Sequence, residues 1–245
     1  MNDKIKIKQQ PVLLITAAGR GSRMGKEVPK LYLPLAGKPV LAHTLTAFLG
    51  LDLFSSILIV IAPDGKKLFD EQIRIPFFPE ENRFFLIEGG EERQYSVFNA
   101  LKYLHAKKPV QDFVVCIHDG ARPLVDSSLI LSVYKEALSR GAAVPGIPLQ
   151  DTIKEIDNNM EVRSTPPREN YMAIQTPQCF LFSLLWRAHL RAKEENFCGS
   201  DDSMLLERLG IGVKVVPGNF ANLKLTTPFD LEIARAYLAG RRKNG

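Results

Sequence analysis

The side chains best suited to chemistry gather in residues 17–30, directly after a short apolar run. Three glycines lie there at positions 19, 21 and 25, and the cations are Arg20, Arg23, Lys26 and Lys30. Glycine amides approach an anion closely, and several cations in one short loop suit a polyphosphate. A surface loop with solvated charges is the simpler alternative, but the position after a predicted strand favours a binding site.

Two common phosphate-binding motifs do not match this loop. A dinucleotide-binding G-x-G-x-x-G motif requires a glycine where Met24 stands. A Walker A motif requires four residues between its glycines and then Lys-Ser or Lys-Thr, whereas five residues separate Gly19 from Gly25 and Lys26 precedes Glu27. The sequence therefore supports neither a dinucleotide cofactor nor a Walker-type nucleotide site.

Further short motifs combine glycines with charged and hydroxyl side chains. They are GGEER at residues 89–93 with Ser96, HDGARP at 118–123, DT at 151–152, QTPQ at 175–178 and NLKLTTP at 222–228. The first two follow predicted strands, which is where open α/β sheets bind their ligands. Gly89 and Gly90 could also form a plain turn.

In this order, the motifs resemble the 2-C-methyl-D-erythritol 4-phosphate cytidylyltransferases, the IspD family of sugar-phosphate nucleotidyltransferases. The resemblance begins with AAGRGSRMG at residues 17–25 and extends along nearly the whole chain. It implies a transferase that moves CMP from CTP to 2-C-methyl-D-erythritol 4-phosphate, releasing pyrophosphate and giving 4-diphosphocytidyl-2-C-methyl-D-erythritol for isoprenoid biosynthesis. Ribitol 5-phosphate cytidylyltransferase shares several motifs and is the alternative. The alanines at 17–18 and HDGAR at 118–122 favour the methylerythritol acceptor.

The resemblance also implies roles for individual residues. It assigns catalysis to Arg23, Lys30 and Lys224. It assigns nucleotide binding to residues that are mostly small, namely Ala17, Ala18, Gly19, Gly21, Gly89, Gly90, Glu91, Ser96, Asp119 and Gly120. It assigns binding of the acceptor to Arg122, Thr152, Arg168 and Thr176.

Lysine and arginine are the side chains that such a reaction needs. A phosphate oxygen attacks the α-phosphorus of CTP, and cations stabilise the charge that accumulates on the five-coordinate phosphorus. Because the attacking phosphate is already ionised, no general base is required. Magnesium is expected as the cofactor that neutralises the triphosphate, held mainly through CTP phosphate oxygens and water, and we predict no protein ligand for it.

Simpler structural roles stay open for several charged residues. Asp119 and Arg122 could form a salt bridge, and Lys224 could be an exposed lysine without a special task. The acids at 201–202 could cap and begin a helix. His118 is expected to be a packing or tautomer-locked residue, because this phosphoryl chemistry needs no imidazole.

Five apolar runs predict the buried strands that position these motifs. They lie at residues 12–15, 57–62, 84–87, 113–117 and 213–216. Segments with helical spacing of apolar residues lie between them, as at 41–49 and 97–104. This alternation predicts an α/β fold, a Rossmann-like three-layer sandwich with a mostly parallel sheet. We expect one cytidylyltransferase domain over residues 1–245.

Residues 149–178 break the alternation of strands and helices. Short extended pieces at 152–156, 161–165 and 171–176 are separated by an Asp-Asn-Asn turn and by Pro166-Pro167. We expect an inserted β arm that carries Arg168 and Thr176. Such an arm buries too little apolar surface to be stable alone, so we expect it to dock on a second subunit and form a homodimer.

Composition and charge exclude several other classes of protein. The chain is 45% hydrophobic and 24% charged, as in ordinary globular proteins, and its apolar runs are too short to span a membrane. The net charge of +5 comes from residues 1–10 and 241–245, so the neutral body argues against a nucleic-acid partner. Three widely spaced cysteines and the lack of a secretory signal predict a reducing, cytoplasmic location.

Overall fold

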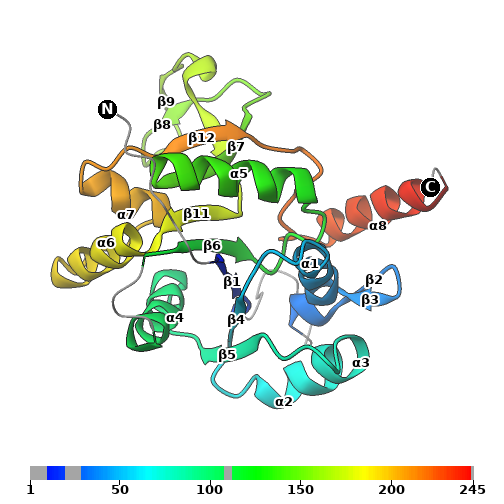
Figure 1. Ribbon diagram of the computed structural model, residues 1–245. Coiled ribbons are helices and arrows are strands. Elements are labelled where there is room, and N and C mark those ends of the chain that lie inside the picture. The colour runs from blue at the N-terminus through cyan, green and yellow to red at the C-terminus, as the bar shows by residue number, and fades with distance from the viewer. Residues whose placement is uncertain (1–9, 20–28, 108–111, 244–245) are drawn as a thin grey trace.

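The computed structural model describes residues 10–19, 29–107 and 112–243, and one sheet of eight strands lies at its centre. The sheet runs from β12 and β7 at the top of Figure 1 to β5 at the bottom. Its order is β10-β7-β11-β6-β1-β4-β5, with β12 also paired to β7. The strands are β1 (Val12–Thr16), β4 (Ser56–Ile61), β5 (Phe84–Glu88), β6 (Val114–Asp119), β7 (Ala142–Pro148), β10 (Met172–Ile174), β11 (Gln178–Leu181) and β12 (Lys214–Pro217).

The half of the sheet from β6 to β5 is parallel throughout. Leu13 of β1 lies opposite Ile57 of β4 on one side and Cys116 of β6 on the other. β11 lies antiparallel between β6 and β7, whereas β12 is parallel to β7. The Rossmann-like arrangement predicted from the alternating pattern is therefore confirmed, with two strands that the pattern did not indicate, β7 and the antiparallel β11.

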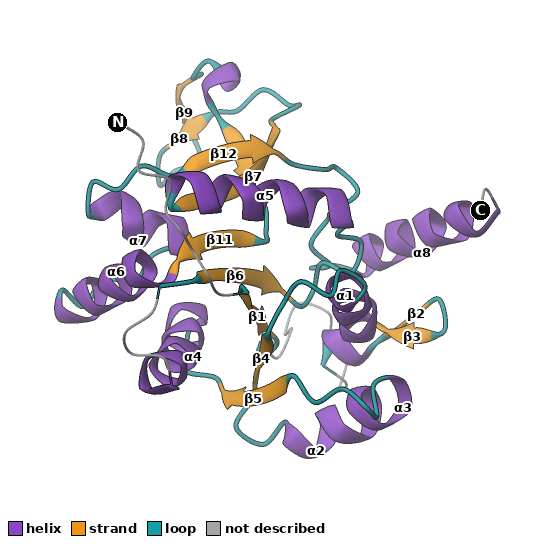
Figure 2. Cartoon of the chain, in the orientation of Figure 1, coloured by secondary structure: helices purple, strands orange, loops and turns teal. Residues whose placement is uncertain are grey.

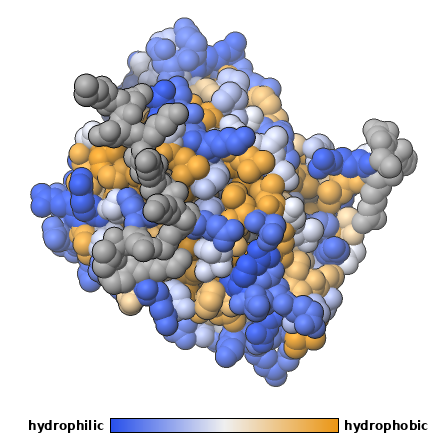
Figure 3. Space-filling view, viewed as in Figure 1, coloured by the Kyte–Doolittle hydropathy of each residue, from blue (hydrophilic) through white to orange (hydrophobic). Residues whose placement is uncertain are grey.

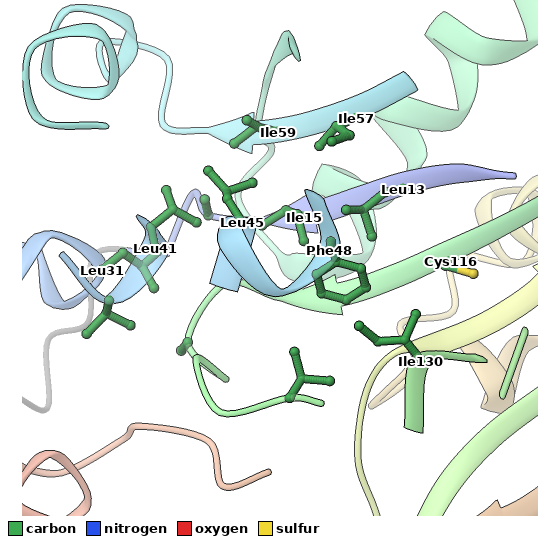
Figure 4. Packing of buried hydrophobic residues seen from close by; sticks show 14 of the residues in the cluster. Leu13, Ile15, Leu31, Leu41, Leu45, Phe48, Ile57, Ile59, Cys116 and Ile130 are labelled. Carbon is green, nitrogen blue, oxygen red and sulfur yellow. The ribbon is translucent and has the colours of Figure 1, made fainter. Parts of the chain in front are cut away.

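Alternate residues of β1 feed two separate cores, one on each face of the sheet. Leu13 and Ile15 pack with α1 (Val40–Leu49) and α5 (Ser127–Arg140), and Figure 4 shows Leu41, Leu45 and Phe48 of α1 turned toward these strand residues. On the other face, the core includes residues of β1, α4 (Arg93–Lys107) and α6 (Phe182–Glu194). This is the predicted three-layer sandwich.

The ends of α5 show how local sequence sets the limits of a helix. The Asp126 carboxylate accepts a hydrogen bond of 2.8 Å from the Leu129 amide and so caps the helix. The helix ends at Gly141, whose φ of 88° is a conformation that a residue with a side chain adopts at a cost. Both ends leave little freedom for where β7 begins.

The remaining elements surround this core. The next described elements after β1 are η2 (Lys30–Tyr32), β2 (Pro34–Leu35) and β3 (Lys38–Pro39). After β4 come α2 (Lys66–Phe69), a π-helical turn (Asp70–Arg74) and α3 (Ile75–Phe77), and later α7 (Asp202–Arg208) and α8 (Pro228–Lys243). α8 extends away from the sheet (Figure 2).

The inserted arm has the predicted antiparallel form. β8 (Glu155–Ile156) pairs with β9 (Val162–Ser164), the helical turn η4 (Arg168–Asn170) follows, and β10 returns to the main sheet beside β7. The Asp157 carboxylate accepts hydrogen bonds from the amides of Asn159 and Glu161, which forms the predicted turn. The top of the molecule, where the arm lies, is mainly hydrophilic in Figure 3. Exposed apolar side chains on it are Ile156, Met160, Val162, Tyr171 and Met172.

The cysteines differ from what their spacing suggested. Cys116 on β6 and Cys179 on β11 are register partners and form a disulfide, while Cys198 is free and exposed. The cysteines therefore do not support the expectation of a reducing compartment, and the cytoplasmic location stays a prediction. No helix within the described ranges is long and apolar enough to cross a membrane.

Candidate active site

A pocket opens at the carboxyl ends of β1, β5 and β6. It is lined by Thr16, Ala18, Gly19, Lys30, Leu31, Gly90, Glu91, Glu92, Arg93, Ser96, Asp119, Ala121 and Lys224. Eight of these were predicted as site residues: Ala18, Gly19, Lys30, Gly90, Glu91, Ser96, Asp119 and Lys224. Segments far apart in the sequence thus meet where the parallel strands end, as the strand pattern predicted.

The other predicted residues occupy three different places. Ala17, Gly89 and Gly120 adjoin the pocket through their backbones, whose amides donate to Val60, Ile61 and Thr16 carbonyls in turn. Arg122 and Thr176 are buried, whereas Thr152 and Arg168 are exposed. Gly21 and Arg23 lie outside the described residues, and so do Arg20 and Lys26.

Small residues allow two loops of the pocket to pack closely. A Cβ atom on Gly89 would lie 2.5 Å from the Ala18 Cβ and 3.2 Å from the Ile61 carbonyl oxygen. A Cβ atom on Gly90 would lie 2.6 Å from the Tyr95 Cβ. The Gly90 amide donates to the Ser96 hydroxyl at 3.0 Å, which ties the loop to the start of α4. The glycines therefore do more than form a plain turn, because the pocket wall needs their lack of side chains.

Asp119, the last residue of β6, is the electrostatic centre of the pocket. Lys224 Nζ lies 2.9 Å from its Oδ2, and the Nε atoms of Arg122 and Arg93 lie 3.6 Å from Oδ2 and Oδ1. The Thr16 hydroxyl donates to Oδ1 at 3.3 Å. Burial by itself would raise the pKa of the Asp119 carboxyl, but Arg93, Lys224 and Arg122 hold that pKa well below its usual range. Asp119 is therefore an ionised group that can only accept hydrogen bonds.

Lys224 is held at the pocket by the segment before α8. The Leu225 amide donates to the Ala121 carbonyl at 2.8 Å, which places Lys224 beside β6. Asp230 accepts from the Thr227 amide at 2.7 Å and its own amide donates to the Thr227 hydroxyl at 3.3 Å. This reciprocal cap fixes where the helix begins. The Lys224 side chain is 41% exposed, so its charge faces the open pocket while it pairs with Asp119.

His118 lies behind Asp119 in a closed hydrogen-bond chain. Its Nε2 lies 3.2 Å from the Arg122 carbonyl oxygen, which can only accept, so Nε2 carries the proton. Nδ1 then accepts from the Thr176 hydroxyl at 3.0 Å, and that hydroxyl accepts from the Asp119 amide at 3.1 Å. Burial lowers the pKa of His118 to about 4, so the ring is neutral near pH 7. His118 has the tautomer-locked place that we expected.

Thr176, which the resemblance assigned to acceptor binding, is part of this hydrogen-bond chain. Thr176 is 5% exposed and its hydroxyl hydrogen points to His118. Its carbonyl accepts from Asn222 Nδ2 at 2.8 Å, and Asn222 in turn accepts from Arg122 Nη1 at 2.8 Å through its own carbonyl. These contacts link three of the sequence motifs into one rigid wall. Contact between Thr176 and the acceptor stays a prediction.

Arg93 is the last residue of the GGEER motif, and no role was predicted for it from the sequence. Arg93 begins α4, lines the pocket and also contacts Asp202 Oδ2 at 2.7 Å. Of the two acids that follow Ser200, Asp201 caps α7 by accepting from the Met204 amide at 3.0 Å, as predicted. Asp202 instead is buried against Arg93 and His189. The place of Arg93 in a glycine-rich motif after a predicted strand was a signal that it could line the pocket, but no local signal indicated its contact with Asp202.

Comparisons with known proteins agree with one another. The family model for IspD, 2-C-methyl-D-erythritol 4-phosphate cytidylyltransferase, matches residues 12–240. The chain is similar to the 2-C-methyl-D-erythritol 4-phosphate cytidylyltransferase of Caldanaerobacter subterraneus subsp. tengcongensis, at 42% identity over 225 residues, which is 92% of this chain and 97% of the relative. It is 40% identical to that of Bacillus cereus over 231 residues, which is 94% of this chain and 99% of the relative.

Solved structures give the same answer. The crystal structure of 4-diphosphocytidyl-2C-methyl-D-erythritol synthase from Anaerococcus prevotii superposes with a TM-score of 0.81 at 30% identity, covering 94% of this chain and 99% of that one. The 2-C-methyl-D-erythritol 4-phosphate cytidylyltransferase from Thermus thermophilus gives 0.75 at 32% identity, covering 94% and 100%. This chain belongs to the 2-C-methyl-D-erythritol 4-phosphate cytidylyltransferase family, IspD.

Proposed function

We propose that this protein transfers CMP from CTP to 2-C-methyl-D-erythritol 4-phosphate, releasing pyrophosphate and giving 4-diphosphocytidyl-2-C-methyl-D-erythritol. One observation carries the proposal: Lys30 and Lys224 line a single glycine-walled pocket beside the ionised Asp119. Such a pocket suits a triphosphate whose α-phosphorus gains negative charge in the transition state. The relatives and solved structures described above are named for the methylerythritol acceptor, so ribitol 5-phosphate is not favoured.

In this proposal, CTP lies between the loops that follow β1 and β5. Gly19 and Ala18 face the triphosphate, and Gly90 and Ser96 face the cytidine. Asp119 accepts a hydrogen bond from a ribose hydroxyl, since an ionised carboxylate needs a donor and the ribose supplies one. Gly21 and Arg23 extend the triphosphate site by family resemblance alone.

Lys30 and Lys224 act as the cations of the transition state, together with Arg23. Lys224 Nζ lies 2.9 Å from Asp119, which holds this ammonium at the pocket wall without removing its charge. Fixed cations stabilise a five-coordinate phosphorus more than they stabilise bound CTP, because its charge grows during the reaction. The acceptor phosphate supplies its own nucleophilic oxygen, so no residue has to remove a proton.

The acceptor phosphate requires further cations, and a second subunit can supply one. Arg122 is 11% exposed at its side chain and is already engaged with Asp119. Arg168 lies on the exposed arm, where its guanidinium donates to the Gln150 carbonyl, and it does not line the pocket of its own chain. We therefore propose a homodimer in which Arg168 and Thr152 of one arm complete the site of the other protomer. The exposed apolar side chains of the arm support this docking.

Magnesium is proposed as the cofactor, because it neutralises the triphosphate and polarises its oxygens when bound. The described parts of the chain hold no group of three or more His, Cys, Asp or Glu side chains that could ligate a metal ion. Mg²⁺ is commonly held by substrate phosphates and water, and we expect the CTP phosphates to hold it here. Asp119 is one of three carboxylates that line the pocket, with Glu91 and Glu92, and three cations already surround it.

The experiment that tests this function is a pyrophosphate-release assay with CTP and two acceptors side by side. We expect a much higher kcat/KM with 2-C-methyl-D-erythritol 4-phosphate than with ribitol 5-phosphate. A higher value with ribitol 5-phosphate contradicts the choice of acceptor. No release with either contradicts the proposed activity.

A further inference from the structure

A buried acid lies behind the nucleotide pocket with no role in the proposed reaction. Asp202, the first residue of α7, has a side chain that is 1% exposed. Its Oδ2 accepts from Arg93 Nη1 at 2.7 Å, and its Oδ1 accepts from His189 Nε2 at 3.0 Å. Burial alone would raise the pKa of Asp202, but Arg93 and His189 lower it, so the carboxylate is ionised.

Arg93 connects this buried acid to the pocket. While its Nη1 contacts Asp202, its Nε lies 3.6 Å from Asp119 Oδ1. Its side chain is 28% exposed and lines the pocket, so Arg93 bridges the buried Asp202 and the site. A free arginine side chain samples many rotamers, whereas a short charge-assisted hydrogen bond to a buried carboxylate restricts it to one.

Loss of the Asp202 charge would change where the Arg93 side chain lies. Without Asp202, nothing among its described contacts would anchor the far side of the Arg93 guanidinium, which could then swing fully onto Asp119 or into the pocket. Either movement changes which oxygen of Asp119 stays available. A buried carboxylate is costly to keep ionised, and the hydrogen bonds from Arg93 and His189 offset that cost here.

We propose that Asp202 is a positioning residue for nucleotide recognition: through Arg93, it holds the Asp119 carboxylate in the orientation that accepts a ribose hydroxyl of CTP. This inference rests on the proposed ribose contact of Asp119. It assigns Arg93 to the same recognition unit, and it gives α7 a function although α7 does not line the pocket.

The neighbouring residue supplies a matched control. Gln94 joins α4 to the same segment, since its Nε2 donates to the Phe197 carbonyl at 2.9 Å and its Oε1 accepts from the Gly199 amide at 2.8 Å. Gln94→Ala therefore loosens the attachment of this segment while it leaves Arg93, Asp202 and their charges in place. A purely structural effect would be shared by both variants.

The test compares kcat/KM for CTP with kcat/KM for its 2′-deoxy and 3′-deoxy analogues. The wild type prefers CTP over the analogue that lacks the hydroxyl bound by Asp119. Asp202→Asn keeps the side-chain volume and removes the charge, and we expect this preference to fall at least tenfold, as in Asp119→Asn. In Gln94→Ala it stays within twofold of the wild type, even if the melting temperature falls.

The outcomes distinguish a failure of the inference about Asp202 from a failure of the proposed contact between Asp119 and the ribose. If Asp119→Asn loses the preference and Asp202→Asn keeps it, the inference is wrong and the proposed ribose contact stands. If Asp119→Asn itself keeps the preference, the ribose contact is wrong and the inference fails with it. Should Asp202→Asn not fold, Arg93→Gln cuts the same bridge at its other end, and an unchanged preference in that variant overturns the inference.

Discussion

The contact between Gly89 and Ala18 offers a sharp test of how the pocket is built. In Gly89→Ala, the added methyl group would lie 2.5 Å from the Ala18 Cβ, whereas carbon atoms normally approach to roughly 3.5–4.0 Å. The two loops must therefore separate by about 1 Å or more. Overpacking of this kind costs about 1–3 kcal/mol.

The cost can be measured in two ways. For a chain of this size, about 1–3 kcal/mol lowers the melting temperature by roughly 2–12 °C. If the displaced loop is the one that holds cytidine, the same free energy lowers kcat/KM for CTP by about 5- to 150-fold. Thermal denaturation and the pyrophosphate-release assay report these two quantities.

A second substitution tests the cause. Ala18→Gly removes the opposing methyl group, so the variant with both substitutions should recover most of the loss. Contacts of 3.0 Å to Ser96 Oγ and 3.2 Å to the Ile61 carbonyl would still prevent full recovery. Gly240→Ala is the control, because nothing lies within 4 Å of its added Cβ on the C-terminal helix. A Gly89→Ala variant with wild-type stability and kinetics, or no rescue by Ala18→Gly, would refute this reasoning.

Three further predictions address catalysis, pH and assembly. Lys30→Ala and Arg23→Ala should fold normally and lower kcat by orders of magnitude, because each removes a cation that acts on the transition state; raised KM with unchanged kcat would indicate substrate binding only. Burial lowers the pKa of His118 to about 4, whereas the ring in the unfolded chain titrates at about 6.5. The contribution of neutral His118 to the free energy of unfolding is therefore complete above about pH 6.5, and roughly 3 kcal/mol of it is lost as the pH falls toward 4. Urea unfolding of His118→Gln should show a flatter dependence in this window, and equal slopes in both proteins contradict the prediction. Reassociated mixtures of Arg23→Ala and Arg168→Ala should regain roughly a quarter of the sites, because random pairing makes half the dimers mixed and each mixed dimer keeps one intact site. If the mixture stays inactive despite proven subunit exchange, Arg168 does not complete the partner's site.

Much of the fold could be predicted because the parallel strands are locally encoded. These parallel strands are apolar runs, so residues 12–15, 57–62 and 84–87 identified β1, β4 and β5 to within a residue or two. β5 was predicted to be buried, but it is the edge strand and is only partly buried. β11 (Gln178–Leu181) was missed, because it is short and antiparallel and its position depends on pairing with strands distant in sequence. The Cys116–Cys179 contact depends on that same register, and so it was missed as well.

The candidate site likewise contains residues that could be predicted from the sequence and a contact that could not. Their places after predicted strands singled out Gly19, Lys30 and Asp119, because the topology brings the carboxyl ends of parallel strands to one edge. Lys224 was assigned by the family resemblance. The Asp202–Arg93 bridge could not be predicted, since it joins the first residues of two helices that are 109 positions apart in the sequence. Acids after a serine are typical of a helix start, so Asp201 and Asp202 look alike in the sequence. Only the burial of Asp202 in the structure shows that its role differs from that of Asp201.

The central claim is that this pocket moves CMP, and a label on the α-phosphorus of CTP tests it most directly. The protein is incubated with this CTP, magnesium and 2-C-methyl-D-erythritol 4-phosphate, and the products are separated. We predict that the label enters 4-diphosphocytidyl-2-C-methyl-D-erythritol while unlabelled pyrophosphate is released, and that Lys224→Ala slows the transfer by orders of magnitude at saturating substrates. Label that stays in CTP with the wild type, or transfer at an undiminished rate by Lys224→Ala, would contradict the claim.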